Sequence, residues 1–216
     1  MRRVIAPLVV LLTSLSGGHL STEPTAVAVT GKSSEHRRIV QLWSVARQAR
    51  AIDRDVVVTG AGHAQPQQAP GATATTSAAW TAGGPVTLTT GRVFFTEGHA
   101  TYSCSGSAVH TDTGNVVLTA GHCVHGGGRR GAFVTDWIFF PGWSEPATAF
   151  PLGAWTATDL FTTTAWSASR SFDDDAGFAV VTGDPGRGTL EQELAETFGA
   201  TAPTIDFASP PVAGDV

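Results

Sequence analysis

Residues 102–125 read YSCSGSAVHTDTGNVVLTAGHCVH and hold both cysteines of the chain, with a histidine directly before the second cysteine. The run at 116–119, Val-Val-Leu-Thr, consists of residues that favour β-structure, and the small pair Ala120-Gly121 ends it. The pattern therefore predicts a β-strand that ends just before His122.

A bond between Cys104 and Cys123 would join the strand that begins near Cys104 to the strand that ends at His122. A disulfide that closes a loop of roughly twenty residues stabilises a fold by about 3 kcal/mol on the chain-entropy account. In an exported chain, two cysteines are better explained by one disulfide than by a redox or metal pair. We expect this disulfide to hold the imidazole of His122 in a fixed orientation, as a general base requires.

The composition argues against nucleic acid as a partner. Of the 216 residues, 42% are hydrophobic and 14% are charged, and the formal net charge is −5. Lys and Arg form no block longer than a short pair, so the chain has no basic surface that could follow a phosphate backbone.

The first 28 residues are predicted to be a secretory signal peptide. Arg2 and Arg3 precede an apolar run at 4–12, and small residues follow that run. The run is too short to span a bilayer as a permanent helix. Cleavage after 16–18 and cleavage after 26–28 both fit the pattern. We therefore expect a secreted protein without a membrane partner once the signal is removed.

After residue 85 the sequence breaks into short β-type runs separated by Gly, Pro, Asp and Thr. Strands are predicted at 92–96, 102–109, 116–119, 133–140, 155–164, 177–182 and 204–207. Short strands at regular spacing are typical of an antiparallel β-barrel. Residues 86–216 are enough for one barrel with its own core. We expect an all-β domain whose tryptophans, among them Trp137 and Trp155, fill the core.

The segment 119–123, Thr-Ala-Gly-His-Cys, preceded by Cys-Ser-Gly-Ser at 104–107, resembles the histidine motif of the chymotrypsin/trypsin-like serine peptidases, in particular their secreted bacterial branch. Members of that family consist of two β-barrels with the active site in the crevice between them. The resemblance implies that residues 86–216 form the first barrel and that His122 is the general acid and base.

The resemblance also selects a carboxylate. Residues 171–181, SFDDDAGFAVV, place an acidic turn directly before an apolar strand, as the aspartate motif of the family does. The match implies that Asp175 orients His122, since a carboxylate at a strand entrance can point inward. Asp173 and Asp174 precede the strand, and we expect both to face solvent.

The nucleophile is where the sequence departs from the family. Members carry a Gly-Asp-Ser-Gly-Gly segment in the second barrel, and that segment does not occur in this sequence. We therefore expect a truncated member with its second barrel largely missing, inactive by itself and able to associate with a C-terminal barrel. A lone barrel would also leave the imidazole of His122 open to water.

Residues 29–85 are predicted to be a pro-segment. A helix is expected at 34–51, with Ile39, Leu42, Trp43 and Ala46 on one face, and the Gly/Ala/Pro/Gln-rich stretch at 60–85 has the composition of a linker. Trp43 with its nearby arginines resembles leader segments of the same bacterial branch. A simple amphipathic spacer helix is the alternative interpretation.

Two other classes of function stay open. One is a non-catalytic secreted β-barrel binding protein derived from the peptidase fold. The other is an exported metal-binding domain that uses His122, Cys123 and His125, but no second Cys/His cluster completes four ligands. We assign no metal and no cofactor, and we expect a protein or peptide substrate as the partner.

Overall fold

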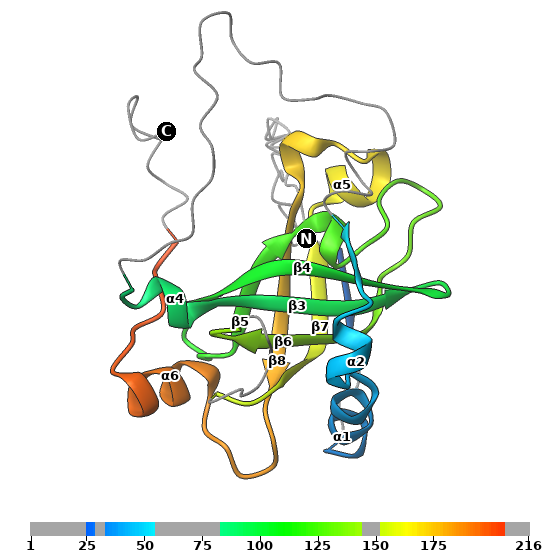
Figure 1. Cartoon of the computed structure of the whole chain (residues 1–216). Helices are drawn as coiled ribbons and strands as arrows, with labels where there is room; N and C mark the ends of the chain where they lie inside the picture. The colour runs from blue at the N-terminus through cyan, green and yellow to red at the C-terminus, as the bar shows by residue number, and fades with distance from the viewer. Residues whose placement is uncertain (1–24, 29–32, 55–82, 144–151, 206–216) are drawn as a thin grey trace, which may run out of the picture.

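The computed structural model describes residues 25–28, 33–54, 83–143 and 152–205 (Figure 1). The predicted signal peptide lies outside these ranges except for the backbone of β1 (Thr25–Ala28), which pairs with β7. Most of the predicted linker at 60–85 also lies outside them. Among the described residues, no helix has both the length and the apolar character needed to cross a membrane.

Six of the described strands form a closed antiparallel barrel, so the predicted all-β fold class is confirmed. Its strands follow one another around the barrel in the order β3 (Thr90–Glu97), β4 (Ala100–Val109), β5 (Val116–Ala120), β8 (Ala176–Thr182), β7 (Trp155–Thr162) and β6 (Thr135–Pro141). The barrel closes because β6 also pairs with β3. No edge of these strands is left along the barrel wall.

One predicted strand is not seen in its described part. Residues 204 and 205 of the expected strand at 204–207 lie in no strand, and residues 206 and 207 lie outside the described ranges. This part of the chain is held instead by single contacts, since Pro203 accepts a hydrogen bond from the backbone N–H of His110, and Ala200 and Ala202 are buried.

The barrel interior is filled by large apolar side chains. Trp137, Phe139 and Trp155 are buried there, as the aromatic spacing predicts. Helix α6 (Leu190–Phe198) adds Leu190 and Leu194 to this core and lies at the end of the barrel opposite α5 (Thr164–Ser169), as Figure 1 shows. Helix α4 (Val86–Thr89) leads into β3.

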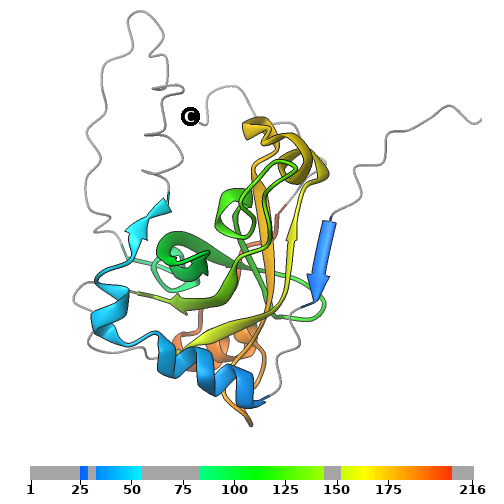
Figure 2. The same cartoon turned by 90° about the vertical axis from the view of Figure 1, so that its right-hand side faces the viewer.

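Strands β3 and β6 are apolar on both faces. Phe94, Ile138 and Phe140 alternate with core residues, so they point out of the barrel, and a second buried cluster covers them. The cover is residues 33–54, which we call the N-terminal strap. It contains α1 (Ser33–Leu42), α2 (Val45–Gln48) and β2 (Ile52–Asp53), and Figure 2 shows its helices against the outside of the barrel.

The helix predicted at 34–51 therefore corresponds to α1 and α2, but its buried face differs from the predicted one. His36, Ile39 and Trp43 are buried, whereas Ala46 is exposed. The helical path is interrupted at residues 43 and 44, between α1 and α2, so the spacing of a single continuous helix does not extend to Ala46.

Cys104 and Cys123 are joined by a disulfide, with their Cα atoms 6.2 Å apart. The bond connects β4 to the short 3₁₀ turn η1 (Gly121–Cys123) that follows β5. Both cysteines are part of the barrel core.

We expect the Cys104→Ala/Cys123→Ala double variant to unfold with a free energy lower by about 3 kcal/mol, because the cross-link limits the unfolded ensemble. Urea denaturation of both proteins measures the difference. A reductant should lower the stability of the wild type and leave the double variant unchanged. Equal stabilities without reductant would contradict the expected role of the bond.

Candidate active site

His122 lies where β5 gives way to the 3₁₀ turn η1, as the sequence predicts. The β5–β8 register pairs Ala120 with Ala176 and so brings the end of β5 beside the start of β8. This pairing places Asp175, which directly precedes β8, next to His122 although the two are far apart in the chain.

Asp175 binds His122 at two points. Oδ2 lies 2.6 Å from Nδ1 of the imidazole, and Oδ1 accepts a hydrogen bond of 2.7 Å from the backbone N–H of His122. An ionised carboxylate only accepts hydrogen bonds, so this contact favours the tautomer with the proton on Nδ1. The two contacts of Asp175 therefore hold the imidazole in position and favour that tautomer.

The neighbouring carboxylates have other surroundings. Asp173 and Asp174 are exposed on the 3₁₀ turn η2 (Phe172–Asp174), and Asp174 accepts a hydrogen bond of 2.8 Å from the hydroxyl of Ser171. The side chain of Asp175 is only 12% exposed. Of the three adjacent aspartates, Asp175 is the one that the structure brings to His122.

The imidazole is not open to water, so that expectation is wrong. The side chain of His122 is only 9% exposed. The buried indole of Trp166, from α5, lies edge-on to the imidazole with the ring centres 6.1 Å apart, and Phe172 packs edge-on against the same indole. Trp166 is therefore part of the wall of the site, and its position between β7 and β8 carried no sequence signal that pointed to His122.

Gly121 leaves room for the carboxylate of Asp175. A Cβ at this position would lie 2.8 Å from Oδ1 of Asp175 and 2.8 Å from Oγ1 of Thr162. A methyl group cannot fit at these distances without moving Asp175 or Thr162. The glycine before His122 is therefore needed for the approach of the carboxylate.

A metal has no suitable ligand set here. Ligand atoms of Cys104, His122 and Cys123 lie within 4.8 Å of one another, the one such group among the described residues. The sulfur atoms of Cys104 and Cys123 are joined in a disulfide, so neither is a thiolate that could bind zinc. His125, the third residue of the metal hypothesis, is not in the group.

His125 is a buried residue. Its Nδ1 accepts a hydrogen bond of 3.0 Å from the backbone N–H of Gly127, and its ring packs on Phe133. Burial lowers the pKa of His125 below its ordinary value of 6.5, and the carboxylate of Glu97 opposes this shift. His125 is therefore held neutral and stabilises the loop after His122.

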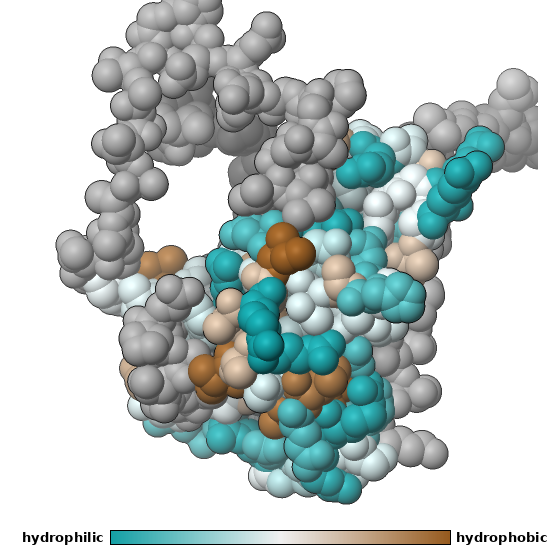
Figure 3. Space-filling view, turned by 45° about the vertical axis from the view of Figure 1, so that its right-hand side comes forward, coloured by the Kyte–Doolittle hydropathy of each residue, from teal (hydrophilic) through white to brown (hydrophobic). Residues whose placement is uncertain are grey.

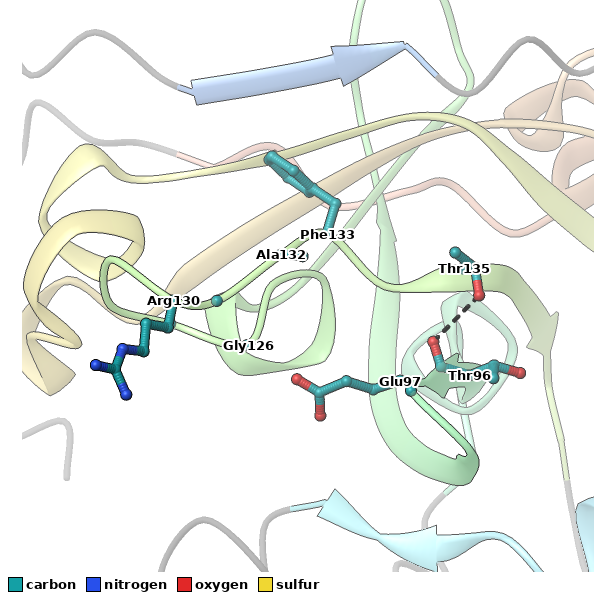
Figure 4. Close-up of a pocket in the computed structure, with 10 residues that line it drawn as sticks. Thr96, Glu97, Gly126, Arg130, Ala132, Phe133 and Thr135 are labelled. Carbon is teal, nitrogen blue, oxygen red and sulfur yellow. Dashed lines mark hydrogen bonds between the residues drawn. The ribbon is translucent and has the colours of Figure 1, made fainter.

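Figure 4 shows a pocket of about 400 Å³ between the β3–β4 turn and the loop at 126–135. Glu97 points across it toward the segment around Gly126, while Arg130 points away. The carboxylate of Glu97 already forms an ion pair with Arg54, with Nη2 of Arg54 2.6 Å from Oε2. The pocket therefore offers no unpaired carboxylate for a ligand.

The comparisons with known proteins give partial matches. A scan against models of protein families finds no match, and a search of curated proteins finds none. Among solved structures, a thermostable serine protease, AL20, from an extremophilic microorganism is 31% identical over 57% of this chain and 53% of its own, with a TM-score of 0.50. The protease Anisep from Arthrobacter nicotinovorans is 32% identical over 58% and 52%, with a TM-score of 0.48.

The barrel thus matches part of a solved serine protease. This chain spans about half the length of the proteases it matches, at 53% and 52% of their chains.

We expect Gly121→Ala to displace Asp175 and to lower the free energy of unfolding by about 1–3 kcal/mol, because the added methyl group overlaps the carboxylate. Urea denaturation measures the loss, and faster hydrogen exchange of the His122 amide reports the broken backbone contact. In an Asp175→Ala background the same methyl group should lower the free energy of unfolding by a smaller amount. An equal decrease in both backgrounds would contradict the overlap between the methyl group and the carboxylate.

The pH dependence of stability should reflect His125. The unfolded chain takes up the proton of this residue at a higher pH than the folded chain, because the folded pKa lies below 6.5. Stability is therefore lost as the pH falls below about 6.5. Urea midpoints at pH 7.5 and 5.5 should differ less in His125→Asn than in the wild type.

His110 serves as the control, because its pKa shift has the opposite sign. The hydrogen bond to Glu191 raises the pKa of His110, so its contribution is present at low pH and is lost as the pH rises through the folded pKa. His110→Asn should widen the difference between the two midpoints. A narrower difference in His110→Asn, or an unchanged one in His125→Asn, would refute the assignment.

Proposed function

We propose that this chain is the histidine- and aspartate-bearing barrel of an exported trypsin-like serine endopeptidase, a hydrolase of peptide bonds. His122 is the general acid and base, and Asp175 is the residue that orients it. The observation that carries the proposal is the double contact of Asp175 with His122, through the imidazole and through the backbone. The partial match to a serine protease supports it.

The chemistry follows from the tautomer. With the proton on Nδ1, Nε2 of His122 can take the proton of a serine hydroxyl while that oxygen attacks a peptide carbonyl. Asp175 stabilises the imidazolium that forms, and His122 then returns the proton to the leaving amine. Because Asp175 also holds the backbone N–H of His122, the imidazole does not have to reorganise between the two proton transfers.

In the proposed enzyme the nucleophile belongs to a second barrel. No Gly-Asp-Ser-Gly-Gly segment occurs in the chain. A hollow of about 500 Å³ borders Asp175 and is lined by Ser105, Ser107 and Leu118, among others. This surface of β4 and β5 is where we place the second barrel, which would bring the serine and the oxyanion donors to His122.

Export is part of the proposal. It rests on the signal-like pattern at 1–28 and on the disulfide, which persists in oxidising compartments. The substrate class is protein or peptide, because the solved structure with the higher TM-score is a serine protease.

A second candidate function is a non-catalytic secreted binding protein that has kept the peptidase barrel. The low exposure of the His122 side chain, 9%, favours it, because a buried imidazole is poorly placed to meet a substrate. In that case the contact between His122 and Asp175 would serve only the stability of the barrel.

The two functions are separated by joining this chain to the second barrel of a related serine protease. We expect the joined protein to hydrolyse casein and to react with a fluorophosphonate probe, and the chain alone to do neither. His122→Ala and Asp175→Asn should lower hydrolysis by about 10³- to 10⁴-fold. Asp174→Asn, a matched change one residue away, should leave it unchanged.

Two outcomes would contradict the proposal. One is saturable, His122-dependent labelling of a serine in the chain alone. The other is a folded joined protein whose hydrolysis does not depend on His122, which would favour the binding protein.

A further inference from the structure

The N-terminal strap covers the outer face of the barrel. Phe94, Ile138 and Phe140 project outward from β3 and β6, and Ile39 and Trp43 of the strap complete their buried cluster. Ile39 and Trp43 are each 2% exposed, and the ring of Trp43 lies 5.5 Å from that of Phe94. Without the strap, three large apolar side chains would face water together.

Figure 3 shows how the hydrophobic residues appear with the strap in place. In this view they form small separate patches between hydrophilic residues rather than one continuous area. The strap therefore belongs to the layer that screens the barrel from solvent.

Polar contacts fix the strap at both ends. Near its start, the buried His36 lies 2.9 Å from the hydroxyl of Thr156 through Nδ1 and 3.1 Å from Asp184 through Nε2. At its end, β2 pairs in parallel with β4, and the buried Arg54 forms an ion pair with Glu97 while stacking on Tyr102. Buried polar contacts therefore anchor the strap to the barrel near both of its ends.

The centre of the strap contacts a residue of β6 that has an unusual backbone conformation. Asp136, with φ of 54°, lies in the left-handed region, where a side chain causes strain. The indole of Trp43 donates a hydrogen bond of 2.7 Å to the carbonyl of Asp136, and Arg38 donates to its carboxylate. The strap thus stabilises both the backbone and the side chain of Asp136.

Trp137, which follows Asp136, connects this residue to the candidate site. The indole of Trp137 donates a hydrogen bond of 3.1 Å to the carbonyl of Cys123, which directly follows His122. The register between β3 and β6 shifts at the same place, between Phe94 and Thr96. Asp136 and Trp137 therefore join the strap to the segment that carries His122 through two consecutive residues.

We propose that the N-terminal strap is a permanent part of the folded barrel and that Trp43 and Arg38 are positioning residues for the His122 segment. They hold Asp136 in its left-handed conformation, and Trp137 passes this constraint to Cys123. The strap then remains bound after any cut in the predicted linker, unlike a pro-segment that leaves. The inference does not rest on peptidase activity.

Retention is tested on the full chain with the recognition sequence of a site-specific protease inserted between Gln68 and Ala69. After cleavage, the piece that contains the strap should co-elute with the barrel on size-exclusion chromatography without denaturant. Separate elution of the strap from a barrel that keeps its disulfide and its near-UV spectrum would overturn the proposal and support a detachable pro-segment.

Positioning is tested by hydrogen exchange of two indole N–H groups. In Trp43→Phe/Arg38→Ala, the indole of Trp137 should exchange roughly tenfold faster. The indole of Trp155, which donates to Leu152 on another part of the barrel, is the internal control and should change little. Arg37→Ala, an exposed change on the same helix, is the control variant.

A rescue variant separates positioning from general loosening. Glycine adopts a φ of 54° without strain, so Asp136→Gly added to the double variant should return the Trp137 exchange rate to within about twofold of the wild type. Equal acceleration at Trp137 and Trp155, or no rescue by Asp136→Gly, would show that the strap covers the barrel without positioning the His122 segment.

Discussion

The contact of one carboxylate with one histidine at two points is the constraint on which the candidate site depends. Asp175 reaches both the imidazole and the backbone N–H of His122, so neither the ring nor the peptide that carries it can turn independently. This requires the β5–β8 pairing, which brings the two residues together, and a glycine at 121, which leaves the carboxylate room. The disulfide and the indole of Trp166 then hold the same turn from its other sides.

The barrel around the site needs a second layer because two of its strands are apolar on both faces. A strand with one face exposed to solvent alternates apolar and polar residues. The segments Trp-Ile-Phe-Phe at 137–140 and Val-Phe-Phe at 93–95 show no such alternation. Half of these side chains fill the interior, and the other half require a cover. The N-terminal strap supplies that cover. Strand β6 therefore contacts both the strap, through Asp136, and the segment that carries His122, through Trp137.

Local patterns in the sequence were enough to predict most strands and the strand-end position of His122, because each depends on neighbours in the chain. The choice of Asp175 among three aspartates came from the resemblance to the aspartate motif of the peptidases, and the structure places this residue against His122. The burial of His36 could not be predicted, since it depends on residues far away in the chain. His36 meets partners 120 and 148 positions along the chain. The left-handed Asp136 was also hidden, because the hydrogen bonds from Trp43 and Arg38 that stabilise this conformation come from residues far away in the chain.

The separation between His36 and its partners also bears on how the chain folds. The strap is synthesised early, yet Thr156 and Asp184, which bind His36, are made long afterwards. Long-range contacts of this kind form slowly, because a large loop must close before they become favourable. Ile39 and Trp43 therefore stay unburied until β6 and β7 exist, and the outer layer of the barrel is completed only after most of the chain has been made.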